Sequence, residues 1–169
     1  MEPLVDTIIE DPRWEGIALP ALATRAVTAA LTTLALPLRG FTLCLMGCDD
    51  LRIAALNADF RAKPTPTNVL SWPSDDRSAR SAGEAPEPPE PGTEDDPESL
   101  GDIALAWETC LAEAEAAGKP TADHVTHLII HGLLHLLGYD HVDERDAALM
   151  ETTEARILET LGISDPYDG

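Results

Sequence analysis

The five histidines of the chain gather within 18 residues, at positions 124, 127, 131, 135 and 141. His131 and His135 are four residues apart, so on a helix their Cβ atoms lie about 5–6 Å apart on one face, a separation that one metal ion can bridge. His127 shares that face, but the helix rises about 12 Å from His127 to His135, whereas metal–nitrogen bonds are about 2.0–2.1 Å long. The third ligand must therefore come from outside the straight helix.

His141 meets that need. Gly138 ends the predicted helix three residues after His135 and lets the chain turn back toward the first two imidazoles. Three neutral imidazoles leave a fourth position for water, which is typical of catalytic rather than structural zinc. Surface or core histidines without a ligand role are the alternative, which the bridging spacing disfavours. We expect one Zn²⁺ per chain, although three imidazoles also suit nickel, copper or iron.

The motif resembles the HExxH helix of zinc peptidases in geometry but lacks its general base. Position 132 is Gly, where those enzymes carry a glutamate. Peptide hydrolysis by that mechanism therefore has no proton acceptor here. A glycine at this position would instead let another segment or a substrate approach the helix closely.

Hydrophobic periodicity predicts the elements that must position these histidines. Apolar residues at helical spacing, followed by Gly138, predict the histidine-bearing helix from Pro120 onward. The other stretches are strand-like at 4–9, 41–46, 69–72 and 103–106, and helical at 20–34, 49–58, 107–117 and 143–161. Strands that come mainly early and helices that come mainly late indicate an α+β domain with one small sheet.

Length and composition favour a single domain over residues 1–169. The chain is 44% hydrophobic, enough to bury one core. It shows neither a membrane span nor a secretory signal, so we expect a cytoplasmic protein without membrane contact. Three cysteines without a CxxC pair suggest small core residues rather than disulfides or a thiolate site.

The charge is strongly acidic and unevenly spread. A formal net charge of −20 argues against non-specific binding of nucleic acid over the whole surface. The N-terminal half is nearly neutral and holds Arg52, Arg61 and Lys63, so a local basic surface is possible there. Residues 74–99 contain nine acidic residues, five prolines and no large apolar side chain, which predicts a mobile acidic loop.

Several segments together resemble one known family. The stretch from His131 to His141 (HGLLHLLGYDH) is similar to the signature of the YbeY family of bacterial metal-dependent endoribonucleases. Further similarities are LNADFR at 56–61, PTNVLSWP at 66–73, GDI at 101–103 and LGISDPY at 161–167, all in the expected order. Asn68 stands where the family usually has Asp, which removes a charge, and the acidic loop is longer than usual.

The resemblance implies a small mixed sheet backed by helices, with zinc held by His131, His135 and His141 in a cleft that contains Arg61. It further implies cleavage of single-stranded RNA, formation of the 3′ end of small-subunit ribosomal RNA, ribosome quality control, and the ribosome as partner. Arg61 could bind a phosphate through its planar guanidinium, or be a solvated cation at a helix end. Asn68 and Ser71 could hydrogen-bond substrate or terminate a strand. Asp140 could orient a ligand imidazole or form a turn.

Two other functions stay compatible with the residues. The histidine triad specifies activation of water but not the substrate, so a metal-dependent hydrolase of another small phosphoester or amide is one alternative. A ribosome-assembly binding module with structural zinc is the other. The residues do not reveal protein partners, oligomeric state, or whether water or a ribose 2′-hydroxyl attacks phosphorus. We expect His124 and His127 to lie at the rim of the site rather than to ligate.

Overall fold

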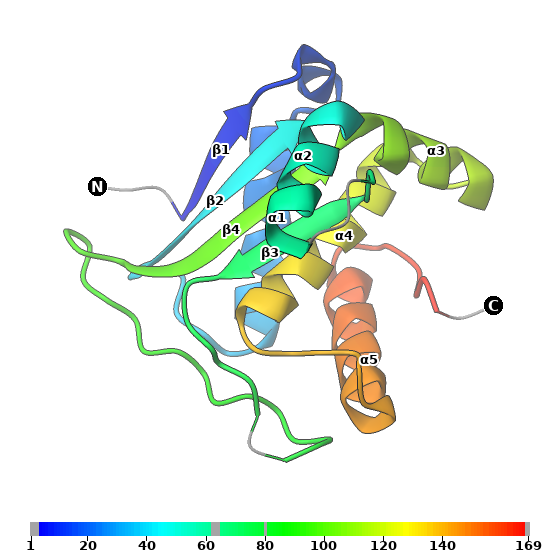
Figure 1. Ribbon diagram of the computed structural model, residues 1–169. Helices are drawn as coiled ribbons and strands as arrows, with labels where there is room; N and C mark the ends of the chain where they lie inside the picture. The colour runs from blue at the N-terminus through cyan, green and yellow to red at the C-terminus, as the bar shows by residue number, and fades with distance from the viewer. Residues whose placement is uncertain (1–3, 62–64, 80, 168–169) are drawn as a thin grey trace.

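The protein folds as an α+β unit around a four-stranded sheet (Figure 1). The computed structural model describes residues 4–61, 65–79 and 81–167, with the backbone alone at residues 60 and 61. Its elements in chain order are β1 (Val5–Ile9), the 3₁₀ helix η1 (Pro12–Ile17), α1 (Leu19–Thr33), β2 (Phe41–Cys48), α2 (Asp50–Arg61), β3 (Val69–Pro73), β4 (Glu98–Ala106), α3 (Trp107–Ala117), α4 (Thr121–Leu136) and α5 (Glu144–Thr160).

The sheet has the order β1-β2-β4-β3 and is mixed. β1, β2 and β4 are parallel, whereas β3 runs antiparallel to β4 at one edge. Helices α1 and α4 cover one face, α2 lies on the other, and α5 packs on α4 and α1 from outside (Figure 1). The predicted α+β class with a small mixed sheet and about five helices is therefore confirmed.

The alternation of β2 explains why both faces of the sheet are covered. Phe41, Leu43 and Leu45 are buried in the main core on the side of α1 and α4. Met46 belongs to a smaller cluster on the other face, where Ile53 of α2 is fully buried. Side chains of one strand thus serve two hydrophobic layers, as the period of two requires. The described cysteines form no disulfide. Cys48 and Cys110 are buried, in line with the core role expected for them, whereas Cys44 is only half-buried.

Helix α4 approaches the sheet at Gly132. A Cβ built at this position would lie 3.3 Å from Cδ1 of Ile103 on β4, closer than ordinary van der Waals contact. Of the two reasons for a glycine at 132, the structure supports close packing of another segment. Gly132, which stands where zinc peptidases carry a glutamate, therefore lets the histidine-bearing helix pack closely against β4.

The acidic segment has neither helix nor strand in its described residues up to Pro97, and β4 starts at Glu98. The predicted loop at 74–99 thus ends within the strand, and the strand expected at 103–106 begins earlier. One end of the segment is anchored: the Arg77 side chain is 9% exposed and donates to the carbonyls of Leu100 and Leu136 at 3.4 and 3.3 Å. Mobility of the remainder stays a prediction.

Among the described helices, none contains an apolar stretch of the length that a membrane span requires.

Replacement of Gly138 tests the contact between the acidic segment at Arg77 and the turn after α4. Gly138 has φ +105°, and a Cβ there would lie 2.1 Å from the carbonyl oxygen of Arg77. Gly118 has φ +66° with nothing within 4 Å of its Cβ position, so Gly118→Ala should cost only the left-handed backbone penalty of about 1–2 kcal/mol. Gly138→Ala should lower the free energy of unfolding by clearly more, because backbone must also shift. Equal losses in urea denaturation would contradict the contact.

Candidate metal centre

The C-terminal end of α4 has the hydrogen bonds of a Schellman motif. The N–H of Gly138 donates to the carbonyl of His135 at 3.1 Å, and the N–H of Tyr139 donates to the carbonyl of Leu134 at 2.9 Å. Gly138 adopts the positive φ that this turn requires. The chain therefore reverses directly after the helix and runs back toward the histidine face.

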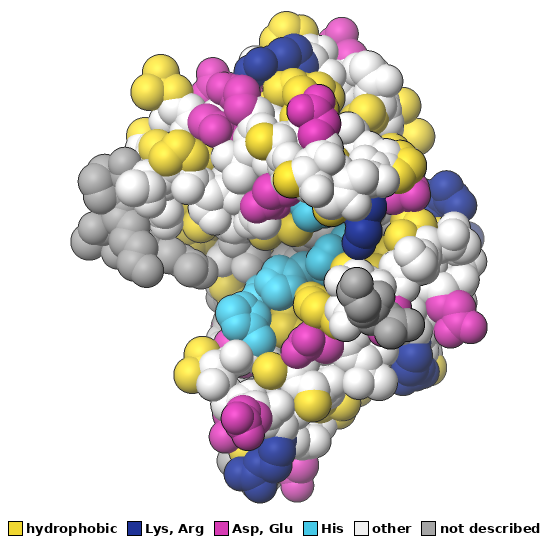
Figure 2. All heavy atoms as spheres, turned by 90° about the vertical axis from the view of Figure 1, so that its right-hand side faces the viewer, with side chains coloured by type: hydrophobic (Ala, Val, Ile, Leu, Met, Phe, Trp, Pro, Cys, Tyr) yellow, Lys and Arg dark blue, Asp and Glu magenta, His cyan; other side chains and the backbone are white. Residues whose placement is uncertain are grey.

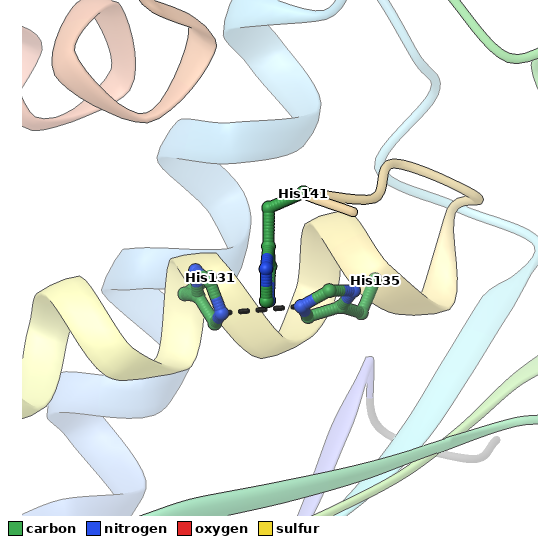
Figure 3. Close-up of side chains that lie close together, drawn as sticks. All are labelled: His131, His135 and His141. Atoms are coloured by element: carbon green, nitrogen blue, oxygen red, sulfur yellow. Dashed lines mark hydrogen bonds between the residues drawn. The ribbon is translucent and has the colours of Figure 1, made fainter. Parts of the chain in front are cut away.

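The reversal brings the three histidines predicted from the sequence together (Figure 3). His131 and His135 project from adjacent turns of α4, and His141 approaches them from the following loop. The Nε2 atoms of His131 and His135 are 3.1 Å apart, and the His141 ring lies 5.0 Å from His135 and 5.5 Å from His131, between centroids. One potential ligand atom from each residue lies within 4.8 Å of the other two.

Hydrogen bonds on the outer side of the rings fix which nitrogen atoms face the cluster. Nδ1 of His135 lies 3.1 Å from the carbonyl oxygen of Tyr139, and Nδ1 of His131 lies 2.5 Å from Oε1 of Glu154. Carbonyl and carboxylate oxygens accept hydrogen bonds, so each Nδ1 carries the proton of its neutral ring. Both Nε2 atoms then present lone pairs toward the cluster.

This donor set fits a cation. Two lone pairs 3.1 Å apart repel each other unless a positive charge lies between them. A proton supplies that charge when one imidazole is protonated, as in the hydrogen bond dashed in Figure 3. A metal ion supplies it with both rings neutral, and ligand atoms of a tetrahedral ion with bonds of about 2.0–2.1 Å lie about 3.3 Å apart. The imidazoles therefore have a spacing suited to zinc.

Electrostatics favour the metal-binding form of His135. Burial, together with the neighbouring His131 and His141, lowers the pKa of its imidazole to about 4. His135 is consequently neutral at physiological pH and free to offer a lone pair. Metal ligation by histidine requires this unprotonated form.

A buried glutamate behind the cluster was not found by the sequence reasoning. Glu154 of α5 has no exposed surface, and its carboxylate contacts His131, His127 and Tyr167. Burial by itself raises the pKa of Glu154, but the hydrogen bonds from these three residues outweigh it and hold the pKa at about 2. A usable signal existed, because an acidic residue on the predicted inner face of the last helix, between Met150 and Ile157, needs a polar partner.

The histidine cluster lies in a cleft of about 550 Å³ (Figure 2). Imidazoles form part of its floor, and acidic side chains gather near its edges. Asn68 and Ser71, the predicted substrate-binding residues, line the same cleft, Asn68 from the position directly before β3 and Ser71 from the middle of the strand. The sequence thus named residues of α4 and β3 that the fold places around one cavity. Other lining residues include Asp75, Asp76, Arg77 and Asp140.

Individual candidates differ in how they are held. The amide Nδ2 of Asn68 donates to Glu113 of α3 at 3.0 Å, and His124 contacts the same carboxylate at 2.9 Å. Asp140 accepts from the backbone N–H of His141 at 2.7 Å, which supports its interpretation as a turn residue. The Arg61 side chain lies outside the described part of the structure, so its predicted role stays a prediction.

His127 lies beside the cluster rather than in it. Its Nε2 atom is 3.1 Å from Oε2 of Glu154, and its side chain is 15% exposed. Together with His131 and Glu154 it forms a second group close enough to hold an ion by proximity alone. Of the five histidines, however, those that line the cleft are at 131, 135 and 141.

Comparison with known proteins identifies the family. A family model described as "Endoribonuclease YbeY" matches residues 10–162. The chain belongs to the YbeY family. Proteins named Endoribonuclease YbeY from Cereibacter sphaeroides and Ruegeria pomeroyi are 65% and 58% identical to it, covering 99% and 96% of this chain and 100% and 97% of their own lengths. The family resemblance inferred from the sequence is therefore confirmed.

A solved structure supports the fold independently. The solution structure of a Thermotoga maritima protein superposes with a TM-score of 0.60, covering 98% of this chain and 99% of its own, at 17% identity. At that identity the match concerns the fold alone. The arrangement of sheet and helices is thus shared with a protein of distant sequence.

Metal content of single variants tests the cluster. His131→Ala, His135→Ala and His141→Ala should each lose most of the zinc that the wild-type protein retains after gel filtration, because two imidazoles leave an incomplete site. His124→Ala is the matched control, since His124 lies on the same helix and contacts Glu113 instead. Elemental analysis decides the assignment, and wild-type zinc content in all three cluster variants would refute it.

The lowered pKa of His135 predicts how pH affects the metal-free protein. The folded pKa of about 4 lies below the ordinary value of 6.5, so between these values the unfolded chain binds more protons than the folded one. The free energy of unfolding should therefore have its full value above about pH 6.5 and decrease as the pH is lowered toward 4. Urea denaturation in chelator measures it, and His135→Ala should flatten this slope. An identical slope in the variant would count against the burial of a neutral imidazole.

Proposed function

We propose that this chain is a zinc-dependent, single-strand-specific endoribonuclease that matures the 3′ end of small-subunit ribosomal RNA and takes part in ribosome quality control. Its relatives carry the name endoribonuclease, which supports RNA cleavage. The sequence resemblance supports ribosomal RNA as the substrate and the ribosome as the partner. Zinc is the proposed metal because three imidazoles with one open position are typical of catalytic zinc sites.

One observation carries the proposal. The Nε2 atoms of His131 and His135 face each other at 3.1 Å on the floor of an open cleft, with their outer nitrogens already hydrogen-bonded. A structural zinc site would be closed by four protein ligands. Here the proposed ligands are three, and the space beside them is large enough for a nucleotide.

Zinc held there would supply a Lewis acid and lower the pKa of water, which suits phosphodiester cleavage. The chain itself must hold the substrate. Asn68 and Ser71 line the cleft within reach of a bound group, and hydrogen bonding to a ribose or base is their proposed role. Since the Nδ2 group of Asn68 donates to Glu113, its side chain is held in place from α3.

The charges of the cleft require a cation for a phosphate. Asp75, Asp76 and Asp140 line it and repel an anion. The guanidinium of Arg77 also lines it, but its donors are directed at carbonyl oxygens and at Glu98. The resemblance to the YbeY family implies that Arg61, at the end of α2, belongs to the cleft, and Arg61 is our candidate for binding the phosphate because its planar guanidinium can donate two parallel hydrogen bonds.

The substrate is tested with purified zinc-loaded protein. A precursor of small-subunit ribosomal RNA with an extended 3′ end, the same sequence annealed to a complementary strand, and a small phosphodiester are compared. Cleavage confined to the single-stranded RNA supports the proposal. Turnover of the small ester alone would favour a general phosphoesterase, and ribosome binding without any cleavage would favour a zinc-stabilised assembly module.

Charge reversal tests Arg61. Arg61→Glu should lower RNA cleavage at least 100-fold while zinc content and melting temperature stay near wild type, because the change is at a helix end. Arg61→Lys should be intermediate, since an ammonium keeps the charge but loses the bidentate geometry. Arg52→Glu is the control: Arg52 lies on the same helix, half exposed, and pairs with Glu10 at 3.4 Å. If both reversals had the same small effect, the phosphate role of Arg61 would be wrong.

A further inference from the structure

A buried carboxylate connects the last helix to the proposed metal ligands. Glu154 lies on α5, fully buried, and α5 packs against α4. Its Oε1 atom is 2.5 Å from Nδ1 of His131, on the side of the ring that faces away from the histidine cluster. Burial of a charged carboxylate costs free energy unless its oxygens are hydrogen-bonded. A fully buried glutamate therefore requires polar partners, which apolar packing alone does not provide.

The second oxygen of Glu154 is also occupied. Oε2 lies 3.1 Å from Nε2 of His127, and it accepts a short hydrogen bond from the hydroxyl of Tyr167. The ring of Tyr167 lies edge-on to His127 with centroids 5.7 Å apart. The carboxylate is thus fixed at both oxygens, by groups from α4 and from the segment after α5.

Hydrogen bonding explains this group better than a second metal ion. Two ligand atoms of one tetrahedral ion lie about 3.3 Å apart when the bonds are about 2.0–2.1 Å long. The separation of 2.5 Å between Oε1 of Glu154 and Nδ1 of His131 is far shorter than that, so the two atoms share a hydrogen bond and leave no room for an ion between them. The group of His127, His131 and Glu154 is therefore a support for His131, not a site of its own.

We propose that Glu154 is a positioning residue for His131 and that Tyr167 holds Glu154 in place. By accepting from Nδ1, the carboxylate selects the tautomer of the neutral His131 ring in which Nε2 carries the lone pair, and it orients that atom toward the cluster. Its negative charge also makes the imidazole a stronger donor to a dication. This inference rests on the proposed metal site. It assigns to α5 and the segment after it the function of orienting a metal ligand, although neither lies within the histidine motif.

The decisive variant is Glu154→Gln, which keeps the shape and loses the charge. Zinc affinity, measured by competition with a chromogenic chelator, should fall about 10- to 100-fold. The visible spectrum of the Co²⁺-loaded protein should change as well, because the orientation of one ligand is no longer fixed. Thr153→Val is the matched control, since Thr153 is also buried on the same helix, 3% exposed, and its hydroxyl donates to the carbonyl of Leu149. It should leave zinc affinity within twofold of wild type.

Tyr167→Phe provides a test that does not depend on a buried substitution. Tyr167 is 44% exposed, so the variant should fold, and removal of its hydroxyl should weaken zinc binding several-fold. Wild-type zinc affinity and an unchanged Co²⁺ spectrum in both Glu154→Gln and Tyr167→Phe would overturn the inference. Because these readouts do not involve RNA, a wild-type protein that binds zinc but cleaves no RNA would refute the proposed function and leave this inference standing.

Discussion

The reversal of the chain at Gly138 is the constraint on which the site depends. A straight continuation of α4 would carry His141 away from His131 and His135, and no helix can place three residues of such spacing on one ion. The left-handed turn does more than redirect the chain. It also places the carbonyl of Tyr139 where it accepts from Nδ1 of His135. Backbone conformation at one glycine therefore fixes both the position of one imidazole and the tautomer of another.

The same turn is one of the places where the acidic segment contacts the rest of the domain. The carbonyl of Arg77 lies where a side chain at position 138 would be, and the guanidinium of Arg77 donates to the carbonyl of Leu136 at the end of α4. A carbonyl at a helix C-terminus has no partner within the helix, so a guanidinium there satisfies a polar group that the turn leaves open. The segment is thus joined to the wall of the cleft at its N-terminal end, however long and acidic the rest is.

Local patterns in the sequence predicted much of the fold and three proposed ligands. The helix expected at 107–117 has the observed bounds, because Trp107 follows a buried strand and Gly118 ends the helix in the left-handed conformation. The histidine spacing needed only the geometry of one helix and one turn. Features of long sequence separation were not accessible: the strand order, and the contact of Glu154 with His131, depend on how α5 packs on α4.

Two misses have a different cause. The 3₁₀ helix at Pro12–Ile17 is a single short element without a measurable period, although it buries Trp14, whose indole donates to the carbonyl of Cys48 at 2.9 Å. The early start of β4 at Glu98 was hidden by acidic residues that resemble the preceding loop. The first residues of β4 form a strand because they pair with β2, and the 3₁₀ helix is held by the hydrogen bond from Trp14 to the carboxyl end of β2. Local composition determines neither element.

The acidity of the protein sets the terms on which it could hold RNA. With a net charge of −20, general attraction to a polyanion is absent, and the salt dependence of binding should reflect few phosphate contacts. Within the proposed function, attraction comes from inside the cleft, where a dication held by three neutral imidazoles would keep its full charge. Carboxylates that line the cleft disfavour a phosphate that merely lies on the surface, whereas one that reaches the histidine cluster would meet positive charge. Within the proposed function, an acidic rim and a neutral ligand set would therefore act together, because binding energy is available chiefly at the point where cleavage occurs. This distribution of binding energy favours cleavage of the RNA over tight binding of uncleaved RNA elsewhere on the surface.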